Sequence, residues 1–165
     1  AVIAMKKKGM LETRKIPGCE LWLDIVEQFH KTKTFYIIGG TNEVIKKTIT
    51  KLKKQYESIN ILNYRDGYIG SKKEKDILFK DISHHKPDIV LVAMGTPSQE
   101  FFMHELHNSY KAIYIGLGGS FDIYTGYIKR APKFLINKNF EWLYRLFREP
   151  KRIVRIRQIL IWLAG

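Results

Sequence analysis

Two glycine-rich turns and one polar turn contain residues suited to binding a charged, hydroxyl-rich ligand. The turns Gly39-Gly40-Thr41-Asn42 and Gly116-Leu117-Gly118-Gly119 could let a backbone approach a pyrophosphate, where N–H groups at a helix start would donate to its oxygens. The same glycines equally suit plain tight turns, with Thr41 or Asn42 as a helix cap. Gln99 favours a functional reading, because its amide can both donate and accept toward a sugar or base.

Gln99 belongs to the turn Gly95-Thr96-Pro97-Ser98-Gln99-Glu100, which combines a rigid proline with an expected helix cap at Ser98. The structural alternative for Glu100 is a favourable interaction with the helix dipole and no contact with a ligand. Farther along, the carboxylate of Asp122 could hold hydroxyl groups or take a proton, and Arg130 could pair with a diphosphate through two parallel hydrogen bonds. A salt bridge between Asp122 and Arg130 that pins the loop is an equal alternative.

Histidine and cysteine are not arranged as a metal site. The five candidate residues lack a supporting third ligand at suitable spacing; they are Cys19, His84, His85, His104 and His107. The sequence also has no Asp-x-Asp motif of the kind that chelates a nucleotide-sugar metal. We therefore expect neither a metal nor another cofactor, so a leaving diphosphate would be stabilised by cationic side chains and helix dipoles.

The elements that position these turns alternate regularly. Four short apolar runs predict buried strands at 35–39, 59–64, 88–94 and 112–117. Helix-length stretches lie at 20–31, 41–56, 72–85 and 99–109. This alternation predicts an α/β fold, a Rossmann-like parallel sheet flanked by helices. Ligands of such sheets bind beyond the carboxyl ends of the strands, where the polar turns lie.

Composition limits the class of protein. A chain of 165 residues can bury one good core, and its net charge of +13 favours anionic partners: nucleic acid, anionic lipid or a phosphorylated substrate. The single cysteine, Cys19, rules out an intrachain disulfide and fits a reducing cytoplasm. The chain begins without a methionine or a helix cap, so we expect that an N-terminal segment precedes Ala1.

Most of the positive charge lies in the C-terminal tail. We expect residues 1–128 to form the α/β domain and 129–165 a basic helical tail, which Pro150 divides into helices at about 139–149 and 151–163. The apolar run of the second helix is shorter than the ~20 residues that cross a bilayer. Its mixture of arginines, aliphatic residues and Trp162 predicts an amphipathic helix lying on an anionic membrane surface. Self-association would use the same apolar residues.

Three motifs in order resemble the WecG/TagA/CpsF glycosyltransferases. They are Gly95-Thr96-Pro97-Ser98-Gln99-Glu100, then Gly116-x-Gly118-Gly119-Ser120-Phe121-Asp122-x3-Gly126-x3-Arg130-Ala131-Pro132, and Glu141-Trp142-Leu143-Tyr144-Arg145-Leu146-x2-Glu149-Pro150-x-Arg152. The resemblance implies inverting, metal-independent transfer of an N-acetylmannosamine-type sugar from UDP to an undecaprenyl-diphosphate-linked amino sugar. It places the enzyme at the cytoplasmic membrane face, in teichoic acid, enterobacterial common antigen or capsule synthesis.

The resemblance also implies roles for individual residues. Gln99 and Asp122 match donor-pocket residues, while Arg14, Arg145 and Arg152 match groups that would bind the diphosphates of donor or acceptor. The family's proposed general base would lie upstream of Ala1, with Asp122 as the alternative base. The catalytic candidates are thus Asp122, Gln99 and Arg14. The full set of substrate-binding candidates is Gly39, Gly40, Gly67, Tyr68, Gly95, Thr96, Pro97, Gln99, Glu100, Gly118, Gly119, Ser120, Phe121, Asp122, Arg130, Arg145 and Arg152.

Two other classes of protein remain as alternatives. A nucleic-acid-binding module would also use basic helices with interleaved aromatics, but the clustering of charge in an apolar-striped tail favours a membrane, so we expect no nucleic-acid partner. A nicotinamide-dependent enzyme would need a third glycine where Phe121 stands, and Asp66 is a poor substitute for the acidic residue that binds ribose.

Overall fold

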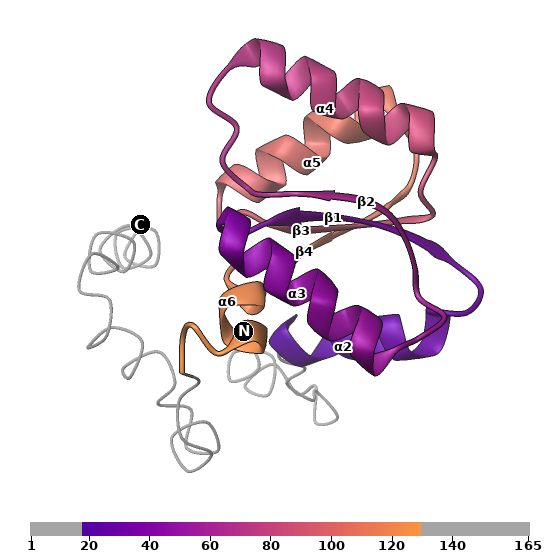
Figure 1. Cartoon of the computed structure of the whole chain (residues 1–165). Coiled ribbons are helices and arrows are strands. Elements are labelled where there is room, and N and C mark those ends of the chain that lie inside the picture. The colour runs from indigo at the N-terminus through magenta and orange to yellow at the C-terminus, as the bar shows by residue number, and fades with distance from the viewer. Residues whose placement is uncertain (1–17, 130–165) are drawn as a thin grey trace, which may run out of the picture. The chain divides into compact units, whose positions relative to one another are not determined.

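The computed structural model describes residues 18–129 and has the predicted α/β architecture, with a parallel sheet between helices (Figure 1). The strands are β1 (Thr34–Gly39), β2 (Asn60–Arg65), β3 (Ile89–Ala93) and β4 (Ile113–Gly116), in the order β2-β1-β3-β4. The helices are α2 (Gly18–Phe29), α3 (Asn42–Gln55), α4 (Lys72–His85), α5 (Ser98–Ser109) and α6 (Ser120–Thr125). Within residues 18–129, no helix is long and apolar enough to cross a membrane.

Helices α3 and α4 begin and end where local chemistry dictates. The Thr41 side chain accepts a hydrogen bond from Val44 N and caps α3. Ser71 caps α4 in the same way through Glu74 N, and Lys86 ends α4 in the left-handed conformation. The predicted bounds of α4 are confirmed, whereas α5 differs in its cap. Pro97 occupies the N-cap position of α5 and Ser98 is its first residue, so the prediction of a Ser98 cap is wrong.

Two apolar cores lie on the two faces of the sheet. On one face, residues such as Phe35, Ile37 and Leu91 pack with Trp22 of α2 and with the apolar side of α3. On the other face, Tyr36, Ile38, Val90 and Val92 pack against α4 and α5. Strand β1 contributes to both cores because successive side chains point to opposite faces. The central strands β1 and β3 are therefore buried on both sides, as their continuous apolar runs predict.

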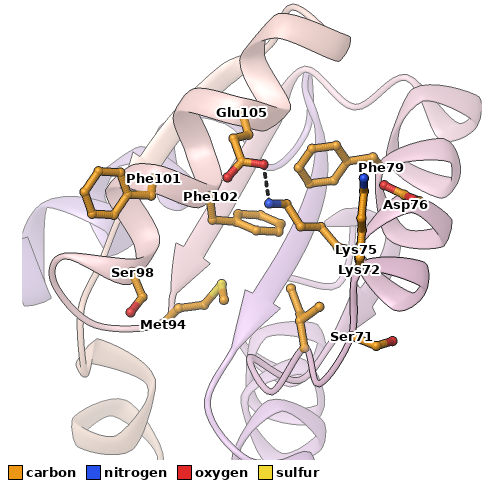
Figure 2. Close-up of a pocket in the computed structure, with 11 residues that line it drawn as sticks. Ser71, Lys72, Lys75, Asp76, Phe79, Met94, Ser98, Phe101, Phe102 and Glu105 are labelled. Atoms are coloured by element: carbon orange, nitrogen blue, oxygen red, sulfur yellow. Dashed lines mark ion pairs between the residues drawn. The ribbon is translucent and has the colours of Figure 1, made fainter.

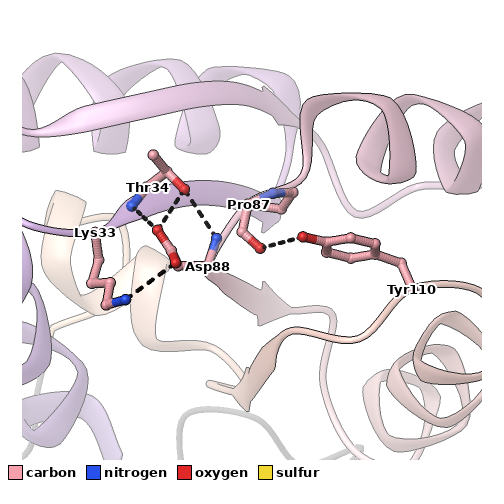
Figure 3. Close-up of polar contacts among 5 residues, drawn as sticks. All are labelled: Lys33, Thr34, Pro87, Asp88 and Tyr110. Carbon is pink, nitrogen blue, oxygen red and sulfur yellow. Dashed lines mark hydrogen bonds and ion pairs between the residues drawn. The ribbon is translucent and has the colours of Figure 1, made fainter.

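A polar cluster joins β1 and β3 at the amino edge of the sheet (Figure 3). Thr34 N and Thr34 Oγ1 donate to Asp88 Oδ2 at 2.8 and 2.9 Å, and Asp88 N donates to Thr34 Oγ1 at 3.0 Å. Lys33 Nζ lies 3.3 Å from Asp88 Oδ1. The hydrogen bonds from the backbone and side chain of Thr34, followed by Lys33, lower the pKa of Asp88 below its ordinary value of 3.8. The ionised carboxylate thus stabilises the start of both strands.

We expect Asp88→Asn to lower the free energy of unfolding by about 1 kcal/mol at pH 7, because it removes a charged acceptor that is 39% exposed. Since the folded-state pKa is depressed, this contribution is present above the ordinary pKa and is lost as the pH falls through the folded-state value. Urea unfolding at neutral pH and at a pH well below 3.8 would measure the difference. An equal difference at both pH values would contradict this electrostatic account.

Candidate functional site

The switch point of the sheet lies between β1 and β3. The chain leaves β1 toward β2 on one side and later crosses to β3 on the other, and all neighbouring strands are parallel. The turns that follow β1 and β3 therefore diverge from a shared carboxyl edge. Open α/β sheets bind ligands in the crevice at such a point.

Three glycines bring the turns after β1 and β2 into close contact. Gly40 N donates to Ala93 O at 3.1 Å, and Gly67 N donates to Gly40 O at 2.9 Å. Gly39 has φ +138°, and a Cβ there would lie 2.2 Å from Ala93 O. A Cβ on Gly67 would lie 3.1 Å from Gly39 Cα. We call Gly39, Gly40 and Gly67 the glycine junction. Because these residues have no side chains, the turns after β1 and β2 pack closely against each other and against the end of β3.

Tyr68 follows the glycine junction and is exposed to solvent. Its side chain is 72% exposed, which is high for an aromatic residue. Its backbone N–H donates to Asp66 Oδ1 at 2.9 Å, so the turn that presents the ring is held by a local hydrogen bond. An aromatic face beside a close-packed backbone turn can stack on a flat ring such as a nucleobase.

Gln99 joins the turn after β3 to the turn after β4. The side chain is only 4% exposed, and its Oε1 accepts from Gly118 N at 2.8 Å. Its Nε2 donates to Glu100 Oε1 at 2.9 Å, and the same oxygen accepts from Thr96 Oγ1 at 3.1 Å. Glu100 therefore orients the amide of Gln99 toward Gly118.

This arrangement explains two features of the motifs. A Cβ on Gly116 would lie 2.7 Å from Gln99 Nε2, so glycine leaves the space that the amide occupies. An amide has two N–H groups and two lone pairs, and the bonds to Gly118 and Glu100 use half of that capacity. Gln99 thus positions the Gly118 turn while retaining hydrogen-bonding capacity of its own.

The turn at 118–121 differs from the simple row of backbone donors that its sequence suggests. Gly118 N donates to Gln99, and Ser120 N donates to Leu117 O at 3.2 Å. Ser120 is 4% exposed, and its Oγ donates to Leu117 O. Phe121 is fully buried, with its ring centroid 5.5 Å from that of Trp22. The amides of Gly118 and Ser120 therefore have internal partners, and Ser120 and Phe121 support the turn from inside.

Asp122 lies in the first turn of α6, beside Gly119. A Cβ on Gly119 would lie 3.7 Å from Asp122 Oδ2, and the Asp122 carbonyl oxygen accepts from Ile128 N at 3.0 Å. The carboxylate is half-buried at the same edge as the Gln99 bridge. The alternative pairing of Asp122 with Arg130 concerns a residue outside the described range, as do the roles of Arg14, Arg145 and Arg152 and the expected tail helices.

A pocket of about 450 Å³ lies between α4 and α5, next to the Gly95 turn (Figure 2). Its apolar walls include Phe79, Phe101 and Phe102, and Met94 and Ser98 form the border with the turn. Lys75 forms an ion pair with Glu105 across the pocket and lies 5.7 Å from the centre of the Phe79 ring. Sequence analysis missed this pocket, because its walls come from two helices that pack only in the folded chain.

The described residues, 18–129, hold no group of three or more histidine, cysteine, aspartate or glutamate residues placed to bind a metal ion. The candidates that the structure does bring together at the carboxyl edge come from all four strand-to-helix turns. They are Gly39, Gly40, Gly67, Tyr68, Gly95, Thr96, Pro97, Gln99, Glu100, Gly118, Gly119 and Asp122.

The turns that meet at this edge lie within a match to a known protein family. The sequence model of the glycosyl transferase WecG/TagA/CpsF family matches residues 1–164, nearly the whole chain. The match includes the turn that contains Gln99 and the turn that contains Gly118, which the structure joins by a hydrogen bond.

Proposed function

Because the chain belongs to the WecG/TagA/CpsF glycosyl transferase family, we propose that it transfers an N-acetylmannosamine-type sugar from UDP to an undecaprenyl-diphosphate-linked amino sugar. We place this reaction at the inner face of the bacterial cell membrane, in the synthesis of teichoic acid or another surface polysaccharide. The observation that best supports a donor site is the Gln99 to Gly118 hydrogen bond, which fixes two motif turns beside the switch point of the sheet.

In this proposal, the UDP group lies across the carboxyl edge. The exposed ring of Tyr68 stacks on uracil, and the diphosphate lies against the turns after β3 and β4, where a Cβ on Gly95 or Gly118 would meet open space. Asp122 and Gln99 are near enough to the same turn to bind hydroxyl groups of the donor. Arg14, Arg145 and Arg152 are assigned to the diphosphates on the basis of the family motifs alone.

The reaction proceeds with inversion. A carboxylate removes the proton of the acceptor hydroxyl, the oxygen forms a bond to the anomeric carbon, and the bond from that carbon to UDP breaks on the opposite face. The sugar centre becomes oxocarbenium-like while negative charge builds on the leaving diphosphate, so guanidinium groups there would lower the barrier without a metal. Asp122 is our candidate for the base among the described residues.

We expect Tyr68→Ala to weaken UDP binding by roughly tenfold, because loss of base stacking costs about 1–3 kcal/mol per base. Calorimetric titration with UDP, UDP-N-acetylmannosamine, NAD and a short DNA duplex would test both the pocket and its rivals. Tyr64→Ala is the matched control. Tyr64 is also a partly exposed tyrosine (39%), but it lies within β2 and not in the turn that follows this strand.

The titrations separate the proposed function from its alternatives. UDP binding that falls in Tyr68→Ala but not in Tyr64→Ala supports the donor site. Salt-sensitive DNA binding without any uridine binding would replace the glycosyltransferase site with a nucleic-acid interface. Binding of NAD in place of UDP would indicate a nicotinamide enzyme.

A further inference from the structure

Lysines cover the solvent-facing side of α3. One side of this helix is buried through Val44, Ile45, Ile49 and Leu52, together with Thr48. The exposed side carries five lysines, Lys46, Lys47, Lys51, Lys53 and Lys54, and Glu43 is the only acidic residue of the helix. Five lysines against one glutamate give α3 a marked local excess of positive charge.

Two tyrosines extend this lysine face toward α6. Lys51 Nζ donates to Tyr124 O at 2.7 Å and lies 4.2 Å from the centre of the Tyr124 ring. Lys47 Nζ lies 4.8 Å from the centre of the Tyr127 ring. Tyr127 is 52% exposed and the adjoining Ile128 is 40% exposed. Exposed lysines thus lie beside two tyrosine rings, and the exposed Ile128 follows the second tyrosine in the chain.

This surface adjoins the candidate site. Helix α3 begins directly after the glycine junction, and Ile128 N donates to the carbonyl oxygen of Asp122. We use the name α3 lysine surface for Lys46, Lys47, Lys51, Lys54, Tyr127 and Ile128. A partner that covered it would extend along α3 and reach the carboxyl edge where that helix begins.

We propose that the α3 lysine surface binds a bilayer containing anionic lipids. The inference rests on the proposed function, because a lipid-linked acceptor would then emerge from the bilayer beside Asp122. Lysines attract anionic headgroups, while tyrosine and an aliphatic side chain suit the boundary between headgroups and acyl chains. A nucleic acid would also bind the lysines, but the apolar side chain of Ile128 would contribute less to its affinity than to that of a bilayer.

The charge pattern of the rest of the domain favours this particular surface. Helix α4, on the opposite face of the sheet, mixes its lysines with Glu74, Asp76 and Asp81. Helix α2 carries Glu20, Asp24 and Glu27, so the neighbouring surface is acidic. Helix α4 also has an exposed apolar residue, Ile77, but its four lysines stand among three acidic residues, whereas α3 has five lysines and one glutamate.

The test compares two triple variants of the whole chain. Lys46→Gln, Lys47→Gln and Lys54→Gln together remove three charges from α3, and Lys72→Gln, Lys73→Gln and Lys80→Gln remove three exposed charges from α4. Each variant is sedimented with phosphatidylcholine vesicles that contain phosphatidylglycerol, and with pure phosphatidylcholine vesicles. Each lysine near an anionic surface strengthens binding roughly fivefold, so we expect the α3 triple variant to partition about a hundredfold less and the α4 variant to change little.

Several outcomes would overturn the inference. Equal losses in both triple variants would mean that net charge alone matters, and no loss in either would assign vesicle binding to another part of the chain. A loss of DNA binding with vesicle binding unchanged would make the surface a nucleic-acid interface. Ile128→Ser should also weaken vesicle binding. Unchanged binding in this variant would exclude insertion of Ile128 into the bilayer. UDP titration of the α3 triple variant checks the donor site independently.

Discussion

Replacing Gly39 with alanine is expected to lower the free energy of unfolding by about 3–5 kcal/mol. Gly39 pairs with Ala93 in the register between β1 and β3, and the new Cβ would lie 2.2 Å from the Ala93 carbonyl oxygen. The positive φ of +138° adds conformational strain for any L-residue. Neither strand can move away, because both pack into the central cores. Urea unfolding of wild type and variant would measure the loss.

Gly70→Ala is the matched control for that experiment. Gly70 also lies beyond the carboxyl edge of the sheet, in the turn before α4. A Cβ on Gly70 would have Glu74 Oε1 as its nearest neighbour, at 3.8 Å, which is an ordinary van der Waals distance. We expect this variant to change the free energy of unfolding by less than about 1 kcal/mol. Similar losses at Gly39 and Gly70 would show that the close approach to Ala93 is not the cause.

Gln99→Ala is expected to reduce UDP affinity at least tenfold and to lower the free energy of unfolding by about 1–3 kcal/mol. It removes the acceptor of Gly118 N in a site where Gln99 is 4% exposed, which leaves the turn after β4 without its fixed partner. Calorimetric titration with UDP gives the affinity, and urea unfolding gives the stability.

Glu100→Ala separates positioning from direct contact at this site. It leaves Gln99 in place but removes the oxygen that accepts from Gln99 Nε2 and Thr96 Oγ1. We expect a smaller loss of UDP affinity than for Gln99→Ala, with the Gly118 turn less well ordered. UDP affinity that is unchanged in a folded Gln99→Ala variant would contradict the role of this bridge.

The elements of the fold were predictable from local sequence. Strand ends lie within one residue of their predicted positions, because continuous apolar runs such as residues 89–93 are typical of a doubly covered parallel sheet. Helix α6 was expected only as a helix start after the Gly116–Gly119 turn, because Ser120–Thr125 is too short to show a helical repeat that would give its bounds. The Ser98 cap failed because Pro97 takes the cap position.

The turns that form the site were predictable from the sequence, but the contacts between them were not. Strand order places the four turns at one edge, which general rules for parallel sheets anticipate. The bond from Gly118 to Gln99 depends on the register of β3 against β4, where Val92 is paired with Gly116. No local pattern specifies that register. The burial of Phe121 against Trp22 likewise depends on the packing of α2 on α6.

The cluster of Lys33, Thr34 and Asp88 lies at the opposite end of the strands from the donor turns. Stability is therefore reinforced at one end of the sheet, while the polar turns occupy the other. This separation leaves positions for chemical attachment away from the donor turns. A fluorophore or surface tether attached at Lys86, in the exposed turn just before β3, would leave the carboxyl edge open to substrates and to a bilayer.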